Sequence, residues 1–473
     1  MGKVEFQALL LLEEYMKAFA TCMIAAALCL NGCGIYRADR QSTHDVIQTT
    51  PEYTLGIVEF DDQGWFVDRA EAGTVVKAID QAASQGGAAI VIFIHGWHHS
   101  ARPDDSDLRD FKAALSRLHQ EIELPIYKSA RAKLYNSPDA RVIGLYVGWR
   151  GRSLPGSLDY LTPWDRKAAA VRVGNGDVAE LLTRVHNIYE KYNKPPMYTT
   201  LVTIGHSFGA QVTFAAVADI LKGRAASAIS LTDLHEPAAP ISGFGDVVVL
   251  VNPAFEASVF HSMSELTRAR TFTKKQTPVL LIVSSEADGV NKSFFPISRF
   301  LSVFDEPFGS SSQFREKTRA LGWVPSQLTH CLALAAGKPC AGFPDTHVAA
   351  RNAANKEPIQ AVDLTSGTNT STGFDAAAAV RNAGVWKAED AASPERIELS
   401  GELGLAGTRF YRADASIDVN LPFVVAKATR DVMHGHNDMF DPLFVNFLVR
   451  YVGGATLKRL SMRLNESPIS STQ

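Results

Sequence analysis

Cysteine is scarce in this chain of 473 residues, which contains five. Cys22, Cys29 and Cys33 lie near the N-terminus, so Cys331 and Cys340 are the only pair beyond that region. One pair is too few for a cysteine-rich zinc module, and the histidines at positions 95, 98 and 99 have no partner cysteines near them in the sequence. We therefore expect no metal and no other cofactor.

An excess of charge is also lacking, since 47 Lys and Arg against 50 Asp and Glu leave a net charge of −3 and a pI near 6.5. A chain without a basic excess has no electrostatic footprint for nucleic acid, so no nucleic-acid partner is expected. The apolar segment at residues 18–30 is shorter than the roughly 20 residues that a membrane-spanning helix needs. No internal repeat is present, which excludes a repeat architecture.

A serine with glycines two positions away on each side is the most informative local motif. The pentapeptide Gly-His-Ser-Phe-Gly at residues 205–209 follows a β-branched run at 199–204 and precedes a helix-forming run at 210–217. Small residues on both sides let the backbone bend sharply, so the hydroxyl projects above a sheet with a helix N-terminus beneath it. Ser207 is therefore a candidate nucleophile.

An unbroken apolar run upstream ends in a His-Gly dipeptide. Residues 88–94 are typical of a buried parallel strand, and Gly96 lets the chain turn directly after it. We expect the N–H of Trp97 to face a developing oxyanion beside the N–H of Phe208, the residue after the candidate nucleophile. The His95 imidazole is expected to have no chemical role.

Two acids and two histidines follow in the second half of the chain. Glu286 and Asp288 end another apolar run at residues 277–285, and His434 and His436 precede an amphipathic segment at 443–449. Nucleophile, acid and histidine in this chain order are typical of α/β-hydrolases, and the chain resembles that superfamily. The resemblance covers residues 53–288 and again about 408–452.

The resemblance implies a role for each of these residues. Ser207 would be the nucleophile, Asp288 the acid that orients the imidazole, and His436 the general base. Glu286 stays open as an alternative acid because both carboxylates leave the same strand, and His434 stays open as an alternative base. The implied fold is the α/β-hydrolase fold, with a mostly parallel central sheet flanked by helices and a long insertion between the acid and histidine strands.

The N-terminus predicts export and lipidation. Lys17 precedes the apolar segment, and Leu-Asn-Gly-Cys at residues 30–33 resembles a bacterial lipobox, with Cys33 as the lipidation site. Met16 is expected to be the true start, since Glu13 and Glu14 would otherwise lie inside the signal peptide. Acyl chains on Cys33 would anchor the protein to a membrane on the periplasmic side of the envelope, and Gly34 favours the outer membrane.

The expected activity is that of an envelope-anchored serine hydrolase, a carboxylesterase or lipase whose substrate is an ester-containing small molecule or lipid. A peptide or amide hydrolase or an acyltransferase on the same fold is an alternative. A non-catalytic envelope lipoprotein that uses the fold as a binding scaffold is another. The sequence makes no prediction of the oligomeric state.

The predicted organisation is a signal peptide (1–32), a lipid-anchored linker (33–52), the catalytic domain (53–452) and a C-terminal tail (453–473). Within the domain, residues 289–407 form an insertion whose first, aromatic part is expected to be a cap or extra helices near the active-site edge. Its later part, at 356–405, is expected to be a polar surface excursion. Cys331 and Cys340 are expected to form a disulfide because the periplasm is oxidising.

Overall fold

The computed structural model describes only part of the chain. The described residues are 46–123, 128, 131–132, 140–152, 163–194, 197–230, 236–268, 270–303, 306–343, 403–405 and 407–466. The chain divides into two units, Met1–Ala38 and Asp39–Gln473, and every described element belongs to the second. The predicted signal peptide, Met16 and Cys33 lie outside the described residues. No helix in the described ranges is long and apolar enough to cross a membrane.

One sheet organises the second unit. Its described strands, in spatial order, are β1 (Ile47–Thr49), β2 (Tyr53–Phe60), β4 (Arg141–Trp149), β3 (Gly87–Ile94), β5 (Tyr198–His206), β6 (Val247–Val251), β7 (Leu280–Ser285), β11 (Phe423–Ala428), β8 (His330–Leu334), β10 (Thr408–Arg412) and β9 (Leu403–Leu405). Neighbours from β2 to β8 all run parallel, whereas the β1–β2, β8–β10 and β10–β9 pairs are antiparallel. The predicted mostly parallel central sheet is confirmed.

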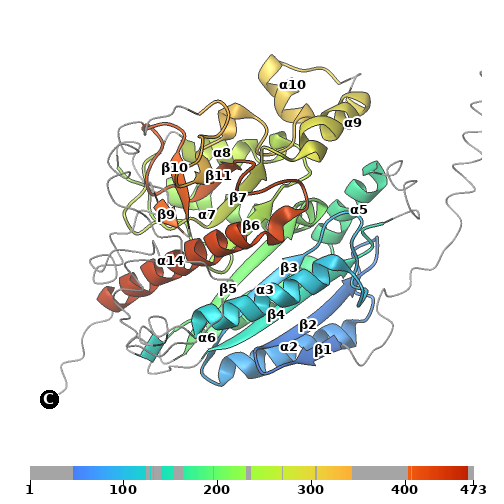
Figure 1. The fold of residues 1–473 in the computed structure, drawn as a ribbon, viewed down its shortest axis with the longest axis vertical. Helices are drawn as coiled ribbons and strands as arrows, with labels where there is room; N and C mark the ends of the chain where they lie inside the picture. The colour runs from blue at the N-terminus through green and yellow to red at the C-terminus, as the bar shows by residue number, and fades with distance from the viewer. Residues whose placement is uncertain are drawn as a thin grey trace, which may run out of the picture. The chain divides into compact units, whose positions relative to one another are not determined.

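Helices cover both faces of this sheet (Figure 1). The longer described helices are α2 (Arg69–Ser84), α3 (Ser106–Ile122), α5 (Pro163–Asn175), α6 (Asp177–Tyr192), α7 (Phe208–Ser230), α8 (His261–Arg268), α9 (Phe295–Ser302), α10 (Ser311–Thr318) and α14 (Pro442–Glu466). Short helical turns are η3 (Ala257–Val259), η4 (Val290–Phe294), η5 (Pro325–Gln327) and η7 (Asp438–Phe440). Helices α2, α5, α6, α7 and α8 pack on one face, and α3 and α14 on the other.

The apolar runs of the central strands follow from this two-sided burial. In β6, Val248 and Leu250 face the cluster under α7, while Val247, Val249 and Val251 face the cluster under α14. A strand covered on both faces needs apolar side chains at successive positions rather than at alternate ones. The same reason explains the run in β3, which lies between β4 and β5.

The domain extends beyond both boundaries expected from the sequence. Strand β1 pairs with β2 although it lies within residues 33–52, the expected linker. Helix α14 continues to Glu466, and Ala455, inside the expected tail, is completely buried. Both segments carry apolar residues that the sheet and its helices bury, which is why they join the domain.

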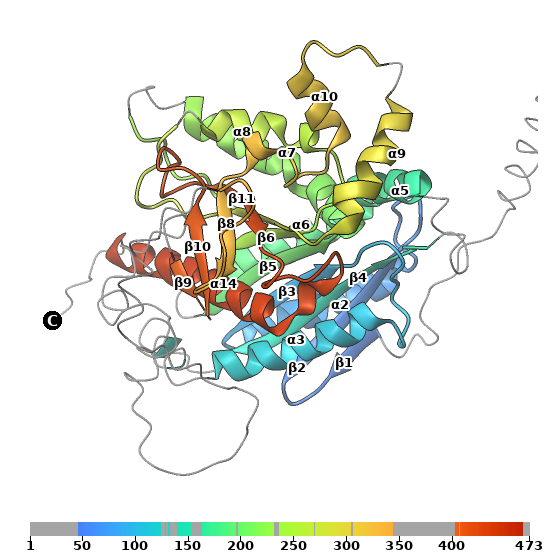
Figure 2. The same ribbon diagram turned by 45° about the horizontal axis from the view of Figure 1, so that its top comes forward.

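The expected insertion contributes to the sheet as well as to a cap. Strands β8 and β9 fall within residues 289–407, and β8 lies between β11 and β10. Helices α9 and α10 lie next to each other at one end of the domain (Figure 2). The expected polar excursion at 356–405 lies outside the described residues except for β9, whose Leu405 is buried and therefore does not fit a surface excursion.

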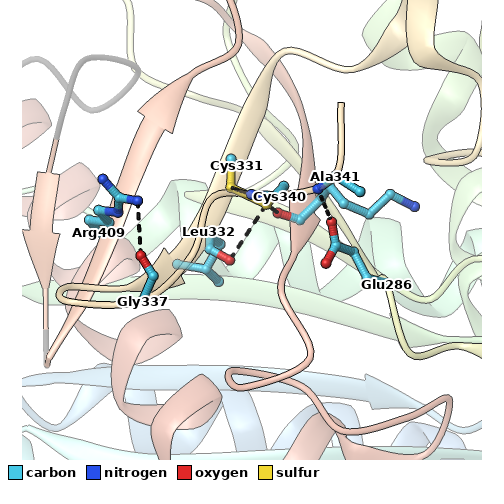
Figure 3. The surroundings of a disulfide bond; sticks show 8 residues. Glu286, Cys331, Leu332, Gly337, Cys340, Ala341 and Arg409 are labelled. Atoms are coloured by element: carbon cyan, nitrogen blue, oxygen red, sulfur yellow. Dashed lines mark hydrogen bonds between the residues drawn. A yellow bond between two sulfur atoms is a disulfide. The ribbon is translucent and has the colours of Figure 1, made fainter. Parts of the chain in front are cut away.

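The predicted disulfide is confirmed: Cys331 in β8 is bonded to Cys340 (Figure 3). Both cysteines are buried, and they form a small cluster of their own with Ala333 and Tyr411. The bridge thus closes the turn that follows β8, a strand separated from β5 by β6, β7 and β11 in the sheet.

Candidate active site

Ser207 lies in a sharp turn between β5 and α7. Its φ is +55°, in the left-handed region that side chains other than glycine rarely adopt. A Cβ at Gly209 would lie 2.1 Å from the carbonyl oxygen of Ile94, and one at Gly205 would lie 2.3 Å from Thr213 Oγ1. Both positions therefore require glycine because other segments of the same chain approach them closely, as the pentapeptide motif predicts.

The turn brings Ser207 against His436. Ser207 Oγ and His436 Nε2 are 2.8 Å apart, within hydrogen-bond distance. On the other side of the ring, His436 Nδ1 lies 2.9 Å from Asp288 Oδ1, within ion-pairing distance. Ser207 follows β5, Asp288 follows β7 and His436 follows β11, so the carboxyl ends of three parallel strands assemble the constellation.

Asp288 is fully buried and its carboxylate is held from both sides. The backbone N–H of Asn291 donates to Oδ1 at 2.9 Å, and the Asn291 side-chain amide donates to Oδ2 at 2.8 Å. The same amide group donates to the carbonyl oxygen of Asn252 at 3.0 Å. Asn291 belongs to η4, a π-helical turn, which is a conformation found often at functional sites.

The loop that carries His436 is fixed by two side chains that sequence reasoning did not single out. Asn252 Nδ2 donates to the His436 carbonyl oxygen at 2.8 Å, and Asn252 Oδ1 accepts from the Ser285 N–H at 2.8 Å. His206 Nε2 donates to the same His436 carbonyl at 2.8 Å. The sequence marks Asn252 only by the Asn-Pro pair after β6, and His206 only by its position next to the serine. Neither pattern reveals which carbonyl it will contact.

His206 is held neutral by its surroundings. The ring is buried, and burial, followed by the charge of nearby His436, holds its pKa well below the ordinary value. A neutral ring with its proton on Nε2 suits the bond to the His436 carbonyl. His206 therefore acts as a fixed hydrogen-bond donor rather than as a titrating group.

Glu286 and His434, the two alternatives, contact other groups. Glu286 Oε1 accepts from the N–H of Ala341 beside the disulfide (Figure 3). The His434 side chain is 62% exposed, and its Nδ1 lies 3.5 Å from Asp441 Oδ2. The structure thus brings together Ser207, His436 and Asp288 and leaves both alternatives outside that contact chain.

The turn after β3 passes directly beside Ser207. A Cβ at Gly96 would lie 2.9 Å from Ser207 Cβ, so only glycine allows the approach. His95 supports the turn: its Nδ1 donates to the Gly96 carbonyl at 3.0 Å and its Nε2 accepts from the Trp149 N–H at 3.1 Å. Burial lowers the pKa of His95 to about 4, which keeps the ring neutral for this pair of bonds.

The two predicted oxyanion donors belong to segments that meet at Ser207. Phe208 is the first residue of α7, where backbone N–H groups have no partner within the helix. Trp97 follows the Gly96 turn, and its ring centroid lies 5.9 Å from that of Phe208. The turn after β3 and the start of α7, the two segments that carry the predicted donors, thus both lie next to the serine.

A small cavity of about 20 Å³ opens beside the serine. It is lined by Trp97, Lys167, Ser207, Phe208, Ala254, Val290, Phe294, Phe295, Ser298 and Arg299. Its walls come from the Gly96 turn, from α5 and from the first turns of the insertion. Lys167 Nζ binds Glu256 Oε1, and Arg299 Nε lies 2.7 Å from the same oxygen, so two cations share one carboxylate at the wall.

Comparisons with known proteins add little to this geometry. No protein-family model matches the chain, and no curated protein sequence matches it. Among solved structures, a Trichoderma reesei cutinase in complex with a C11Y4 phosphonate inhibitor matches with a TM-score of 0.18 and 15% sequence identity. The match covers 47% of this chain and 76% of that chain. A match with so low a score carries no argument about function.

Proposed function

We propose that this protein is a serine hydrolase of carboxylic esters with an α/β-hydrolase fold. The observation that carries the proposal is the contact chain from Ser207 Oγ to His436 Nε2 at 2.8 Å and from His436 Nδ1 to Asp288 Oδ1 at 2.9 Å. A nucleophile, a base within hydrogen-bond reach and a third group that orients the base are the features of an activated serine.

The proposed reaction passes through an acyl-enzyme. Ser207 Oγ attacks the ester carbonyl carbon while His436 Nε2 takes the hydroxyl proton, and Asp288 stabilises the imidazolium that forms. The N–H groups of Trp97 and Phe208 stabilise the oxyanion of the tetrahedral intermediate. The intermediate collapses as His436 gives the proton to the leaving alkoxide. Water, activated by the same histidine, then releases the acid and regenerates the serine.

The cavity favours short acyl groups. Its volume of about 20 Å³ is near the space that a single water molecule needs, so a long acyl chain does not fit into it as it stands. The aromatic rings of Trp97, Phe208 and Phe294 supply an apolar wall for a small alkyl group. An apolar wall beside the serine suits a carboxylic ester with a short acyl group, which is the substrate class that we propose.

The decisive experiment is an activity panel with matched leaving groups. We expect hydrolysis of p-nitrophenyl acetate and butyrate, weaker hydrolysis of p-nitrophenyl palmitate, and no activity of Ser207→Ala on any of them. A panel of p-nitroanilides and peptides tests the amide-hydrolase alternative, and added alcohols test acyl transfer. Absence of Ser207-dependent turnover on every ester would overturn the proposal and favour a binding scaffold.

The location in the envelope is a second part of the proposal. Its support is the Leu-Asn-Gly-Cys motif that ends at Cys33, preceded by a basic residue and a short apolar segment. A lipid on Cys33 would anchor the catalytic domain to a bacterial membrane. Gly34, the residue after this cysteine, favours the periplasmic side of the outer membrane. The disulfide fits an oxidising compartment.

A further inference from the structure

Three potential metal ligands converge in the loop that follows the Gly96 turn. His99 lies on this loop, and Asp105 and Asp107 begin α3. His99 Nδ1 is 3.1 Å from Asp105 Oδ1 and 3.4 Å from Asp107 Oδ1, and one ligand atom from each residue lies within 4.8 Å of the others. The three side chains are nearly buried, with 14%, 10% and 7% of their surface exposed.

These separations fit one small cation at the centre. Zinc binds nitrogen and carboxylate oxygen at about 2.0–2.2 Å, and ligands of a tetrahedron with that radius are about 3.4 Å apart. The two distances from His99 Nδ1 match this edge length without any movement of the backbone. An ion pair alone would need only one carboxylate near the imidazole.

One oxygen of the cluster is unsatisfied. Asp107 Oδ2 is buried and has no hydrogen-bond partner in the part of the chain that the structure describes. Asp107 as a whole is 5% exposed, so solvent does not replace the missing donor. A buried carboxylate oxygen without a donor is unfavourable, and a coordinated cation removes that cost.

The ligands are also held in place by their neighbours. Asp105 Oδ2 accepts from the Ser100 N–H at 2.9 Å, and Asp105 Oδ1 accepts from the Asp107 N–H at 2.9 Å. Tyr146 Oη donates to the Ser100 carbonyl at 3.0 Å, which ties this segment to β4. Such supporting bonds orient the ligands of metal sites, because they fix the carboxylate before the metal arrives.

The charges of the two carboxylates match the charge of a divalent cation. Asp105 and Asp107 bring two negative charges, Asp110 on α3 is a third acid near Asp107, and Arg152 is a cation near His99. Two buried carboxylates and one neutral imidazole around a divalent cation form a neutral unit. We propose that His99, Asp105 and Asp107 bind one zinc ion, which connects the loop after the Gly96 turn to the start of α3.

Zinc is preferred over the harder cations because of the donor set. Imidazole nitrogen suits zinc, whereas magnesium and calcium select oxygen ligands. Three protein ligands leave one position for water or for Asp107 Oδ2. The sequence alone predicts no metal here because the histidines at positions 95, 98 and 99 have no partner cysteines, whereas in this proposal the carboxylates of Asp105 and Asp107 complete the ligand set.

The test is metal binding to the full protein, measured apart from activity. Protein stripped with a chelator is titrated with zinc chloride by calorimetry, and bound metal is counted by mass spectrometry after dialysis. We expect one zinc per chain and, at zinc one-hundredfold above Kd, a melting temperature higher by at least about 2 °C. His99→Ala and Asp107→Asn are expected to weaken binding at least tenfold and to abolish the thermal shift.

Asp104→Asn is the matched control, since Asp104 is 76% exposed and pairs with Arg102 rather than with the cluster. It should bind zinc like the unaltered protein. Fluorophosphonate labelling of Ser207 in each variant shows that the domain is folded. Lack of stoichiometric zinc, or equal thermal shifts in all variants, would show that the cluster is only an ion pair that caps α3. Stoichiometric calcium without zinc would overturn the choice of metal.

Discussion

Ser207 Oγ and His436 Nε2 lie 2.8 Å apart although 229 positions separate the two residues in the chain. The contact exists because β5 and β11 are parallel strands of one sheet whose carboxyl ends lie at the same edge. Strand β6 lies between β5 and β11, and Asn252, which follows it, donates to the His436 carbonyl. This bond holds the His436 loop in place.

The first prediction concerns the nucleophile and base. Ser207→Ala should abolish labelling by a fluorophosphonate probe, and His436→Ala should lower kcat about 10⁴-fold or more because the serine loses its base. His434→Ala is the matched control, since His434 is exposed and lies outside the contact chain, and it should retain near-normal kcat. The reverse outcome for the two histidines would show that the assignment is wrong.

A second prediction concerns Asn252 as a positioning residue. Asn252→Ala removes the amide that holds the His436 loop, so kcat should fall about 10- to 100-fold while KM for a small ester changes less. Stopped-flow rates of fluorophosphonate labelling should fall in parallel, because they report the activated serine without product release. Unchanged labelling together with lower thermal stability would indicate a purely structural role.

A third prediction concerns Lys427, a buried residue of β11 whose Nζ lies 3.5 Å from the ring centroid of Trp323. Burial lowers the pKa of Lys427 to about 7, although the negative charges of Asp288 and Glu286 raise it in part. The unfolded chain therefore binds more protons than the folded one between about pH 7 and 10.4, so this lysine makes stability rise with pH across that window.

Lys427→Met removes this contribution to the pH dependence of stability. The stability of the unaltered protein relative to the variant, measured by urea unfolding, should increase from pH 7 to pH 9. Lys191→Met, at an exposed site, controls for the loss of one lysine charge alone. A constant difference across the pH range would show that Lys427 titrates normally.

A fourth prediction concerns the disulfide between Cys331 and Cys340, which are nine positions apart. So short a loop is worth roughly 2 to 3 kcal/mol in the chain-entropy model. The double variant Cys331→Ser/Cys340→Ser should lose about that much stability and keep most esterase activity at moderate temperature. Total loss of activity in a folded variant would show that the β8 turn helps to shape the active site.

A fifth prediction concerns the lipobox. Globomycin, which blocks cleavage before a lipidated cysteine, should cause a larger precursor to accumulate, and Cys33→Ser should release the protein from membranes or block its processing. Cys22→Ser is the control, since that cysteine lies within the predicted signal peptide. Palmitate incorporation that persists in Cys33→Ser would contradict the assignment.

Local patterns in the sequence were sufficient to predict several features. The apolar runs at β3, β5 and β7 predicted a parallel sheet because a strand that is buried on both faces has apolar residues at successive positions. The glycines around Ser207 predicted the sharp turn because a close backbone approach excludes a Cβ. The disulfide was predicted because two cysteines remained beyond the N-terminal region of a chain for which the sequence predicts export.

Other features depend on contacts between distant segments, which leave no local pattern. The order of Glu286 and Asp288 along the chain did not decide which carboxylate reaches His436. The π-helical turn and Asn291 decide that, by burying Asp288 and bonding both of its oxygens. The same limit applies to His206 and Asn252, whose shared target is a carbonyl more than 180 positions away. It applies equally to His99, Asp105 and Asp107, where the separations of buried atoms, and not the residue types alone, favour a cation. Sequence composition determined which elements form and where their buried faces lie, whereas the register of the sheet determined which polar side chains meet at its edge.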